Sequence, residues 1–241
     1  LYAEIWRGRL DSFFRDIEIR TMLIWLAIMT IVFAASLTAT AEFDSLPAMM
    51  RRGLFMLISA FSTTGFQNIT SNQLVTAFSS GAFLVVALLM AVGGSAGSTT
   101  GGIKFARIGF IFKSIAATIK ENIAPDSARV VEDYNHVGRR VLTPETVKAA
   151  TTIFVLYVVT YLIGAVVGIA HGYDAIQSIF ESVAMASNGG LSAGLTAPGM
   201  PPTLEVFYIF EMWAGRLEFV TFLALIVQIA VSLDPRRWRR R

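Results

Sequence analysis

The chain has 241 residues, of which 54% are hydrophobic and only 15% are charged, and it contains no cysteine. A soluble domain carries about 25% charged residues, so this composition predicts an integral membrane protein. The absence of cysteine excludes disulfides and thiolate metal sites, and we expect the chain to bind no cofactor. Because residues 1–20 begin with Leu1 and lack the apolar stretch of a signal peptide, we expect the chain to be part of something longer.

Four apolar segments predict membrane spans. Residues 21–41 and 149–170 are uncharged and reach the roughly 20 residues that a helix needs to cross a bilayer. Residues 74–92 begin a third span, which runs into GGSAGSTTGG and resumes as IKFARIGFIFKSI. Residues 205–233 form a fourth span, which contains four charged residues: Glu205, Glu211, Arg216 and Glu218.

Two shorter segments, residues 47–61 and 174–186, lie between these spans. Pro47 after Ser45 is a favoured helix start, and Asp174 is a suitable N-cap. Neither segment is long enough to cross a bilayer, and each leads into a turn that contains glycine. We interpret both as re-entrant pore helices; the alternative is two extracellular loops that each contain a helical turn.

The two turns belong to an internal repeat with an offset of 125 residues, in which Phe55 corresponds to Phe180 and Gly65 to Gly190. Irregular backbone survives at membrane depth only where protein buries it or where it lines a cavity. Backbone carbonyls can replace the water shell of a monovalent cation without adding charge. The pattern therefore predicts a potassium filter formed by Ser62, Thr63, Thr64, Gly65 and Phe66 together with Ser187, Asn188, Gly189, Gly190 and Leu191.

Side-chain oxygens of Thr63, Thr64 and Asn188 are further candidates for ion contact. The alternative for these three residues is packing and hydrogen bonding behind the filter. For Asn188 the two interpretations stay open.

The small polar stretch in the third span predicts an intramembrane gate. Paired interruptions in two repeats indicate the substrate path, and the Gly215–Arg216 pair lies at nearly the same place in the fourth span. A phosphate-binding loop requires lysine directly after glycine, whereas Ile103 separates Gly102 from Lys104; a glycine kink that serves helix packing is the other alternative. The candidate gate residues are Gly93, Gly94, Ser95, Gly97, Ser98, Thr99, Thr100, Gly101, Gly102 and Arg216.

Arg216 lies within a span, where an arginine costs roughly 2.5–3.5 kcal/mol on insertion scales. Such a charge faces a cavity or a partner, so we expect Arg216 to contact the gate loop below the filter. The alternative is a structural ion pair with another helix.

The distribution of Lys and Arg predicts the orientation. Seventeen of the 20 lie in the N-terminal segment, in the stretch from Lys104 to Lys148 and in the basic tail RRWRRR. We expect the termini and the linker in the cytoplasm of a multi-pass cell-membrane protein, and we interpret the tail as an anchor to anionic lipid rather than a nucleic-acid site. The expected organisation is a cytoplasmic segment (1–20), one pore unit (21–118), a linker (119–145), a second pore unit (146–233) and the tail (234–241).

The motifs AFSTTGF, SNGGLS, GGSAGSTTGGIK and WAGRLE, in this order, resemble the third and fourth units of the Trk/Ktr/HKT superfamily of potassium transporters, in particular its TrkH/KtrB branch. The resemblance implies an all-α polytopic membrane protein with two repeats of transmembrane helix, re-entrant pore helix, filter loop and transmembrane helix. It also implies potassium as the transported ion and a cytoplasmic ring of nucleotide-binding regulatory subunits. The first two pore units would come from a longer chain or a second copy, and the full-length chains would form a homodimer.

Three other functions compete with a potassium pore. A secondary transporter of another family would hold a small solute at broken helices, but GGSAGSTTGG has no charged residue. An intramembrane enzyme would need clustered His, Asp or Glu within the spans, and only the fourth span contains acidic residues. A non-conducting scaffold or receptor leaves the repeated turns unexplained.

Overall fold

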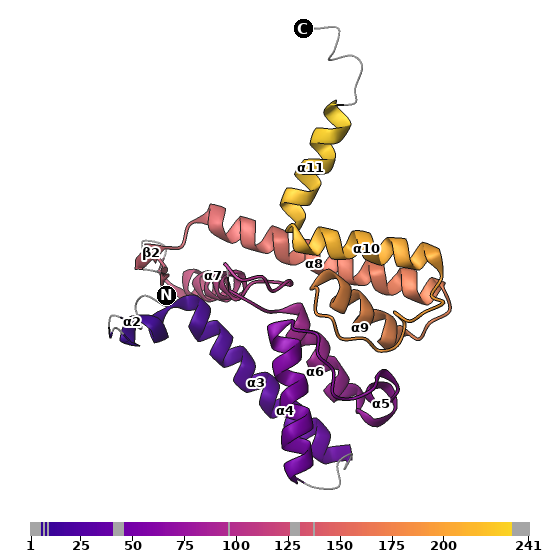
Figure 1. Ribbon diagram of the computed structural model, residues 1–241. Coiled ribbons are helices and arrows are strands. Elements are labelled where there is room, and N and C mark those ends of the chain that lie inside the picture. Colours follow the sequence, from indigo (N-terminus) through magenta and orange to yellow (C-terminus); the bar gives the residue numbers. More distant parts are fainter. Residues whose placement is uncertain are drawn as a thin grey trace.

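The structure, a computed structural model, describes Trp6, Gly8 and residues 10–40, 46–95, 97–125, 131–136 and 138–232. Ser45, Ala96 and the basic tail, on which parts of the sequence interpretation rest, lie outside the described residues. The described chain is helical apart from one short β-hairpin. The expected all-α polytopic membrane fold is therefore confirmed, and Figure 1 shows how its helices are arranged.

The first repeat begins with a short helix and a long apolar one and then contains four more helices. Its bounds are α2 (Leu10–Arg15), α3 (Ile17–Thr40), α4 (Leu46–Ser62), α5 (Ser71–Ala77), α6 (Ser80–Ala91) and α7 (Phe105–Ile123). The second repeat follows a hairpin of β1 (Asp133–Asn135) and β2 (Arg139–Val141), which the sequence analysis did not predict. It contains α8 (Pro144–Ala170), α9 (Ala175–Ala186), α10 (Pro202–Arg216) and α11 (Phe219–Ser232).

Local capping explains where several helices begin. The Asp174 carboxylate accepts from the backbone N–H groups of Ile176 and Gln177, so the predicted N-cap of the second re-entrant helix is confirmed. Thr143 caps α8, which therefore begins five residues before the predicted span. Such caps satisfy N–H groups that have no partner within the helix.

The third predicted span, residues 74–92, is wrong at its start because two helices share this region. Thr70 and Gln73 form a capping box at the start of α5, and Ser79 caps α6 through the N–H of Ala82. The apolar run conceals this break because Phe78, between the two helices, is itself apolar and buried. The apolar helix that follows is 12 residues long.

The fourth predicted span, residues 205–233, is also not one helix. It begins earlier, at Pro202, and α10 and α11 meet at an angle of 111°. Glu218 has a positive φ of 58° at the bend, a conformation that costs energy for a non-glycine residue. Figure 1 shows α11 leaving the end of α10 and pointing away from the other helices.

The two repeats pack against each other through their central helices. The contact between α6 and α9 places the Phe83 and Phe180 rings 4.5 Å apart, and α7 lies against both α3 and α8. Phe180, Leu89 and Leu191 are fully buried in this region. The core therefore forms where the pore helix of one repeat meets the broken helix of the other.

The outer faces of the long helices are apolar and exposed. Ile31 on α3 and Val166 on α8 are 69% and 64% exposed, as expected for side chains that face lipid. Within the described residues, Ile17–Leu37 and Pro144–Ala170 are long and apolar enough to cross a membrane, and the bent pair of α10 and α11 would count as a third span.

Candidate ion path: two filter turns and an intramembrane loop

The two predicted filter turns have the same backbone conformation. In the first turn Thr63 and Gly65 have positive φ angles of 49° and 80°, and in the second Asn188 and Gly190 have angles of 53° and 74°. Positive φ is available to glycine but strained for other residues, above all for a β-branched threonine. Strain of this kind gathers at functional sites, and its recurrence at equivalent positions indicates that the turn conformation itself is required.

Each turn is held by the helix before it through equivalent hydrogen bonds. Thr64 N–H donates to Ser59 O at 3.1 Å, and Gly189 N–H donates to Ala184 O at 2.8 Å. These bonds use backbone N–H groups of the turns and not their carbonyls.

The turns also touch each other. A Cβ placed on Gly65 would lie 2.9 Å from the Gly190 Cα, which is closer than real Cβ contacts. Two residues later, the Gln67 amide pairs with Ser192: Nε2 donates to Ser192 O at 3.3 Å, and Ser192 N–H donates to Oε1 at 3.4 Å. These two residues are 125 positions apart, so equivalent positions of the repeats bind one another.

The side chains of the turns mostly bond to nearby protein atoms. Asn188 Nδ2 donates to Met212 O of α10 at 3.2 Å, which is the alternative of bonding behind the filter. The hydroxyls of Ser62 and Thr64 lie 2.5 Å apart. At the ends of the two turns the repeats differ, because Phe66 is 69% exposed whereas Leu191 is fully buried.

A buried carboxylate on α9 holds the segment after the second turn. Glu181 is fully buried, and its Oε1 accepts from Ser192 Oγ at 2.6 Å and from the N–H groups of Ala193 and Leu195 at 2.9 and 3.1 Å. Thr196 Oγ1 donates to Oε2 at 3.4 Å. Sequence analysis missed Glu181; the available signal was an acidic residue in the middle of an apolar pore helix.

The predicted gate is a closed loop between α6 and α7. A parallel bridge joins Val92 to Ile103, and Gly93 N–H donates to Ile103 O at 3.1 Å. The loop therefore leaves and re-enters the helical region at one place. Near its end the loop lies against the second filter turn, because a Cβ on Gly101 would overlap Ser187 O.

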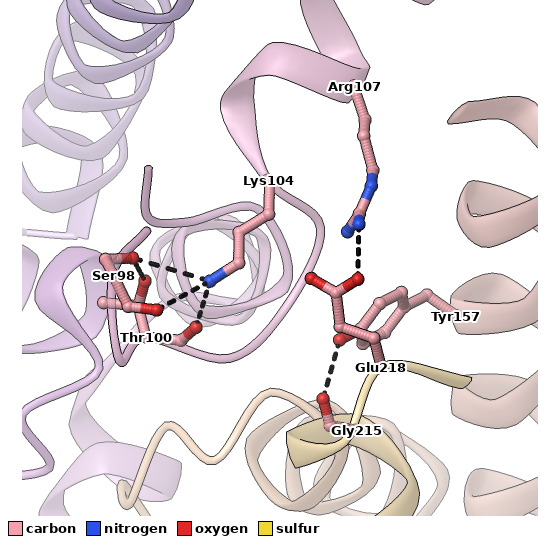
Figure 2. A network of polar contacts seen from close by, with 7 residues as sticks. All are labelled: Ser98, Thr100, Lys104, Arg107, Tyr157, Gly215 and Glu218. Atoms are coloured by element: carbon pink, nitrogen blue, oxygen red, sulfur yellow. Dashed lines mark hydrogen bonds and ion pairs between the residues drawn. The ribbon is translucent and has the colours of Figure 1, made fainter. Parts of the chain in front are cut away.

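The Lys104 side chain lies inside the loop and donates hydrogen bonds to its carbonyls. Its side chain is only 7% exposed, and Nζ donates to Ser98 O at 3.4 Å and to Thr100 O, as Figure 2 shows. An ammonium has three donors, which suits a ring of carbonyls. The sequence analysis used this lysine to argue against a phosphate site and counted it among the basic residues that predict the orientation, but did not predict its role as the anchor of the loop.

The end of α10 meets the same loop. Arg216 Nη1 donates to Thr99 O, and a Cβ on the neighbouring Gly215 would overlap Ala186 O at the end of pore helix α9. Arg216 thus lies where the gate loop and the pore helix come together, and it contacts a loop carbonyl rather than an acidic partner among the described residues.

A salt bridge connects the two broken helices. Arg107 Nη2 at the start of α7 donates to Glu218 Oε2 at 2.6 Å, at the bend between α10 and α11. Figure 2 shows Glu218 beside Tyr157, whose hydroxyl donates to Gly215 O at 3.0 Å. One turn further along α8, the Tyr161 hydroxyl donates to Ala91 O, the last residue of α6, at 3.3 Å.

Two tyrosines on one face of α8 therefore bind the ends of both broken helices. Residues four apart share a helix face, so the pair was visible in the apolar sequence of α8 as two polar groups on one side. Sequence analysis also missed Arg107, because a basic residue close to the linker suggested only orientation.

Re-entrant helices that end in strained turns, enclosed by spanning helices and followed by broken ones, define a polytopic membrane protein of the pore-loop type. The chain belongs to the TrkH family, described as a cation transport protein, which it matches over residues 7–234. Proteins of this family are transporters rather than enzymes.

Several known proteins are similar to this chain. It is 33% identical over 218 residues to an uncharacterized cation transporter of Methanocaldococcus jannaschii, a match that covers 90% of this chain and 43% of the relative. It is 27% identical to the Trk system potassium uptake protein TrkH of Salmonella typhimurium, over 99% of this chain and 47% of that protein. The chain spans about half the length of these relatives.

The fold is also similar to a solved structure. The crystal structure of the potassium transporter TrkH from Vibrio parahaemolyticus matches with a TM-score of 0.73 at 23% identity, over 93% of this chain and 46% of that one. At this level of identity the likeness concerns the fold.

Replacing Glu181 with alanine should destabilise the segment after the second filter turn. The change leaves two backbone N–H groups and two hydroxyls without their buried acceptor, which we expect to cost about 3 kcal/mol. The measurement is thermal unfolding of the purified full-length protein, with Glu205→Ala as control because Glu205 is exposed on α10. An equal change in both variants would contradict a bracing role.

Replacing Lys104 with methionine should loosen the gate loop. The variant keeps the aliphatic bulk and removes the donors to Ser98 O and Thr100 O, and charged hydrogen bonds contribute about 1.5–3 kcal/mol each. Hydrogen–deuterium exchange of residues 93–103 should therefore accelerate about tenfold or more. Exposed Lys148→Met is the control; unchanged exchange in the loop would mean that the backbone bridge alone holds it.

Proposed function

We propose that this chain forms two of the four pore units of a Trk-type potassium uptake system. The observation that carries the proposal is the repeated left-handed turn, Thr63 with Gly65 and Asn188 with Gly190, held by equivalent bonds at the end of two re-entrant helices. Backbone carbonyls are the ligands by which potassium filters replace water. The TrkH relative of Salmonella typhimurium is a potassium uptake protein, which supports potassium as the ion.

The filter strands of this chain supply one half of a ring. A ring of carbonyls around an ion needs strands on all sides, and here Gly65 and Gly190 lie side by side. We propose that two further units complete the ring, from a longer chain or from a second copy, and that full-length chains pair as a homodimer.

The loop of residues 93–102 is the proposed gate below this filter. Its contact with the Ser187 backbone supports this proposal, as do the hydrogen bonds that Arg216 and Lys104 donate to its carbonyls. Two positive charges at this depth oppose a descending cation. A loop of small residues between two helices can move without moving either helix, provided that these contacts are broken.

The proposed topology puts the termini, the hairpin and the start of α8 in the cytoplasm, supported by the excess of Lys and Arg in these segments. A regulatory ring that binds nucleotides would dock on this side. The Arg107–Glu218 salt bridge offers such a partner a route to both broken helices, because α7 continues toward the hairpin.

Replacing Gly65 or Gly190 with serine should reduce the preference for potassium over sodium. Each glycine has positive φ, and a side chain at either site meets the other turn. We would measure rubidium uptake by the full-length protein in competition with sodium. Gly199→Ser is a matched control, because Gly199 also has positive φ but open space around its Cβ position; unchanged selectivity in both filter variants would contradict the assignment.

Replacing Arg216 with glutamine should increase flux through the closed transporter. Two unit charges ~8 Å apart interact by about 2 kcal/mol at an effective dielectric constant of ~20, which corresponds to roughly thirtyfold in rate. Potassium efflux from proteoliposomes without the regulatory partner measures this leak, with exposed Arg51→Gln as control. Lower expression with unchanged flux per protein would identify Arg216 as a structural residue instead.

A further inference from the structure

A cleft of about 870 Å³ lies between α3 and α7, next to the β-hairpin. Its opening is basic. Arg15 lines it from the end of α2, Arg20 from the start of α3, Lys113 from α7 and Arg139 from β2. Four basic side chains from four separate elements converge here, although the segments between them carry acidic residues as well.

The basic charge of the opening is only partly neutralised. Asp133 is the one acidic residue in the lining, and its hydrogen bond to Arg139 lowers its pKa, so this carboxylate is ionised and already paired. Lys113 Nζ donates to Asp133 O at 2.6 Å and lies 3.9 Å from Glu132 Oε2, which leaves further donors on the ammonium. Arg15 is paired with Asp11 at 3.0 Å. The exposed Arg20 side chain has no hydrogen bond or ion pair within the described part of the chain.

The inner part of the cleft is apolar. Ile24 and Ile28 lie one turn apart on the same face of α3, and Phe112 lines the opposite wall from α7. All three are about half exposed or more, at 52%, 48% and 62%. Trp25 also lines the cleft, and its indole N–H has no acceptor among the described residues.

Charge and apolar surface are thus separated along α3. With a rise of about 1.5 Å per residue, Ile28 lies roughly 12 Å along the helix from Arg20. Along α3 the basic side chains therefore come first and the apolar wall follows. A phospholipid has the same order of groups, because its phosphate lies at the membrane surface and its acyl chains run inward. Tryptophan is enriched at the level between the two.

We propose that this cleft binds an anionic phospholipid, with its phosphate at Arg20 and Lys113 and an acyl chain along Ile24, Ile28 and Phe112. Basic clefts between membrane helices are suited to anionic headgroups, and each basic residue near the surface contributes to their attraction. A zwitterionic lipid fits the apolar wall equally well but lacks the net charge that the opening complements.

The position of the cleft connects it to the gate loop. α7 begins at Phe105, directly after the loop, and its Gly109 packs closely against α3, because a Cβ there would lie 2.8 Å from atoms of Ile17 and Thr21. A lipid in the cleft fills the space beside this contact and braces α7 against α3. Lipid binding itself does not depend on the proposed transport function.

The test is lipid retention by the full-length protein, measured by native mass spectrometry after exchange into mixed micelles of phosphatidylglycerol and phosphatidylcholine. The wild type should retain phosphatidylglycerol preferentially. Arg20→Gln should weaken this retention about fivefold, the factor that corresponds to ~1 kcal/mol per basic residue. Ala116→Trp, which adds bulk to the lining on α7, should displace the lipid without changing charge.

Arg140→Gln is the matched control, because Arg140 lies on the same hairpin but outside the lining, and it should retain lipid as the wild type does. Equal retention of the two lipids by the wild type, or undiminished retention in both Arg20→Gln and Ala116→Trp, would overturn the proposal. Displacement of the lipid by glycerol phosphate alone would show an anion site without recognition of an acyl chain, and would also overturn it.

Discussion

A helix that breaks inside a membrane leaves backbone carbonyls that only the protein can satisfy. This constraint acts twice in the chain, at the end of α6 and at the end of α10. At each end one backbone carbonyl accepts a hydrogen bond from a tyrosine hydroxyl, of Tyr161 at α6 and of Tyr157 at α10. Both tyrosines lie on one face of α8, so a single spanning helix supports both breaks. The gate loop depends on the same solution, because its carbonyls receive the Lys104 ammonium and the Arg216 guanidinium. Irregular backbone and positively charged side chains therefore stabilise each other.

The two repeats reach the same filter conformation with different supporting chemistry. In the first, Ser59 Oγ on the pore helix donates to Phe66 O at 2.6 Å. In the second, the carboxylate of Glu181 collects four donors from the segment after the turn. The residue equivalent to Glu181 is the fully buried Met56, so the first repeat packs an apolar side chain where the second uses a charge. The second turn is therefore supported by one carboxyl group with four donors, and the first by a single serine hydroxyl.

The broken helices of the two repeats are also coupled. The Arg107–Glu218 salt bridge spans 111 positions of sequence and joins the start of α7 to the bend between α10 and α11. It is partly shielded, with 18% and 40% of the two side chains exposed. A pair in this setting is screened less than a surface pair. The salt bridge therefore links the start of α7, directly after the loop, to the bend that follows α10.

Much of this protein follows from the sequence alone. Apolar length determines the long helices, glycine with small polar residues identifies both turns and the loop, and the 125-residue offset relates the repeats, because each of these is a local or periodic property. The sequence did not determine the division of α5 from α6, the 111° bend at Glu218, or the roles of Lys104, Glu181 and the two tyrosines. A break or a buried polar side chain is stable only when donors and acceptors from distant segments meet it, and only the tertiary structure decides which of them do.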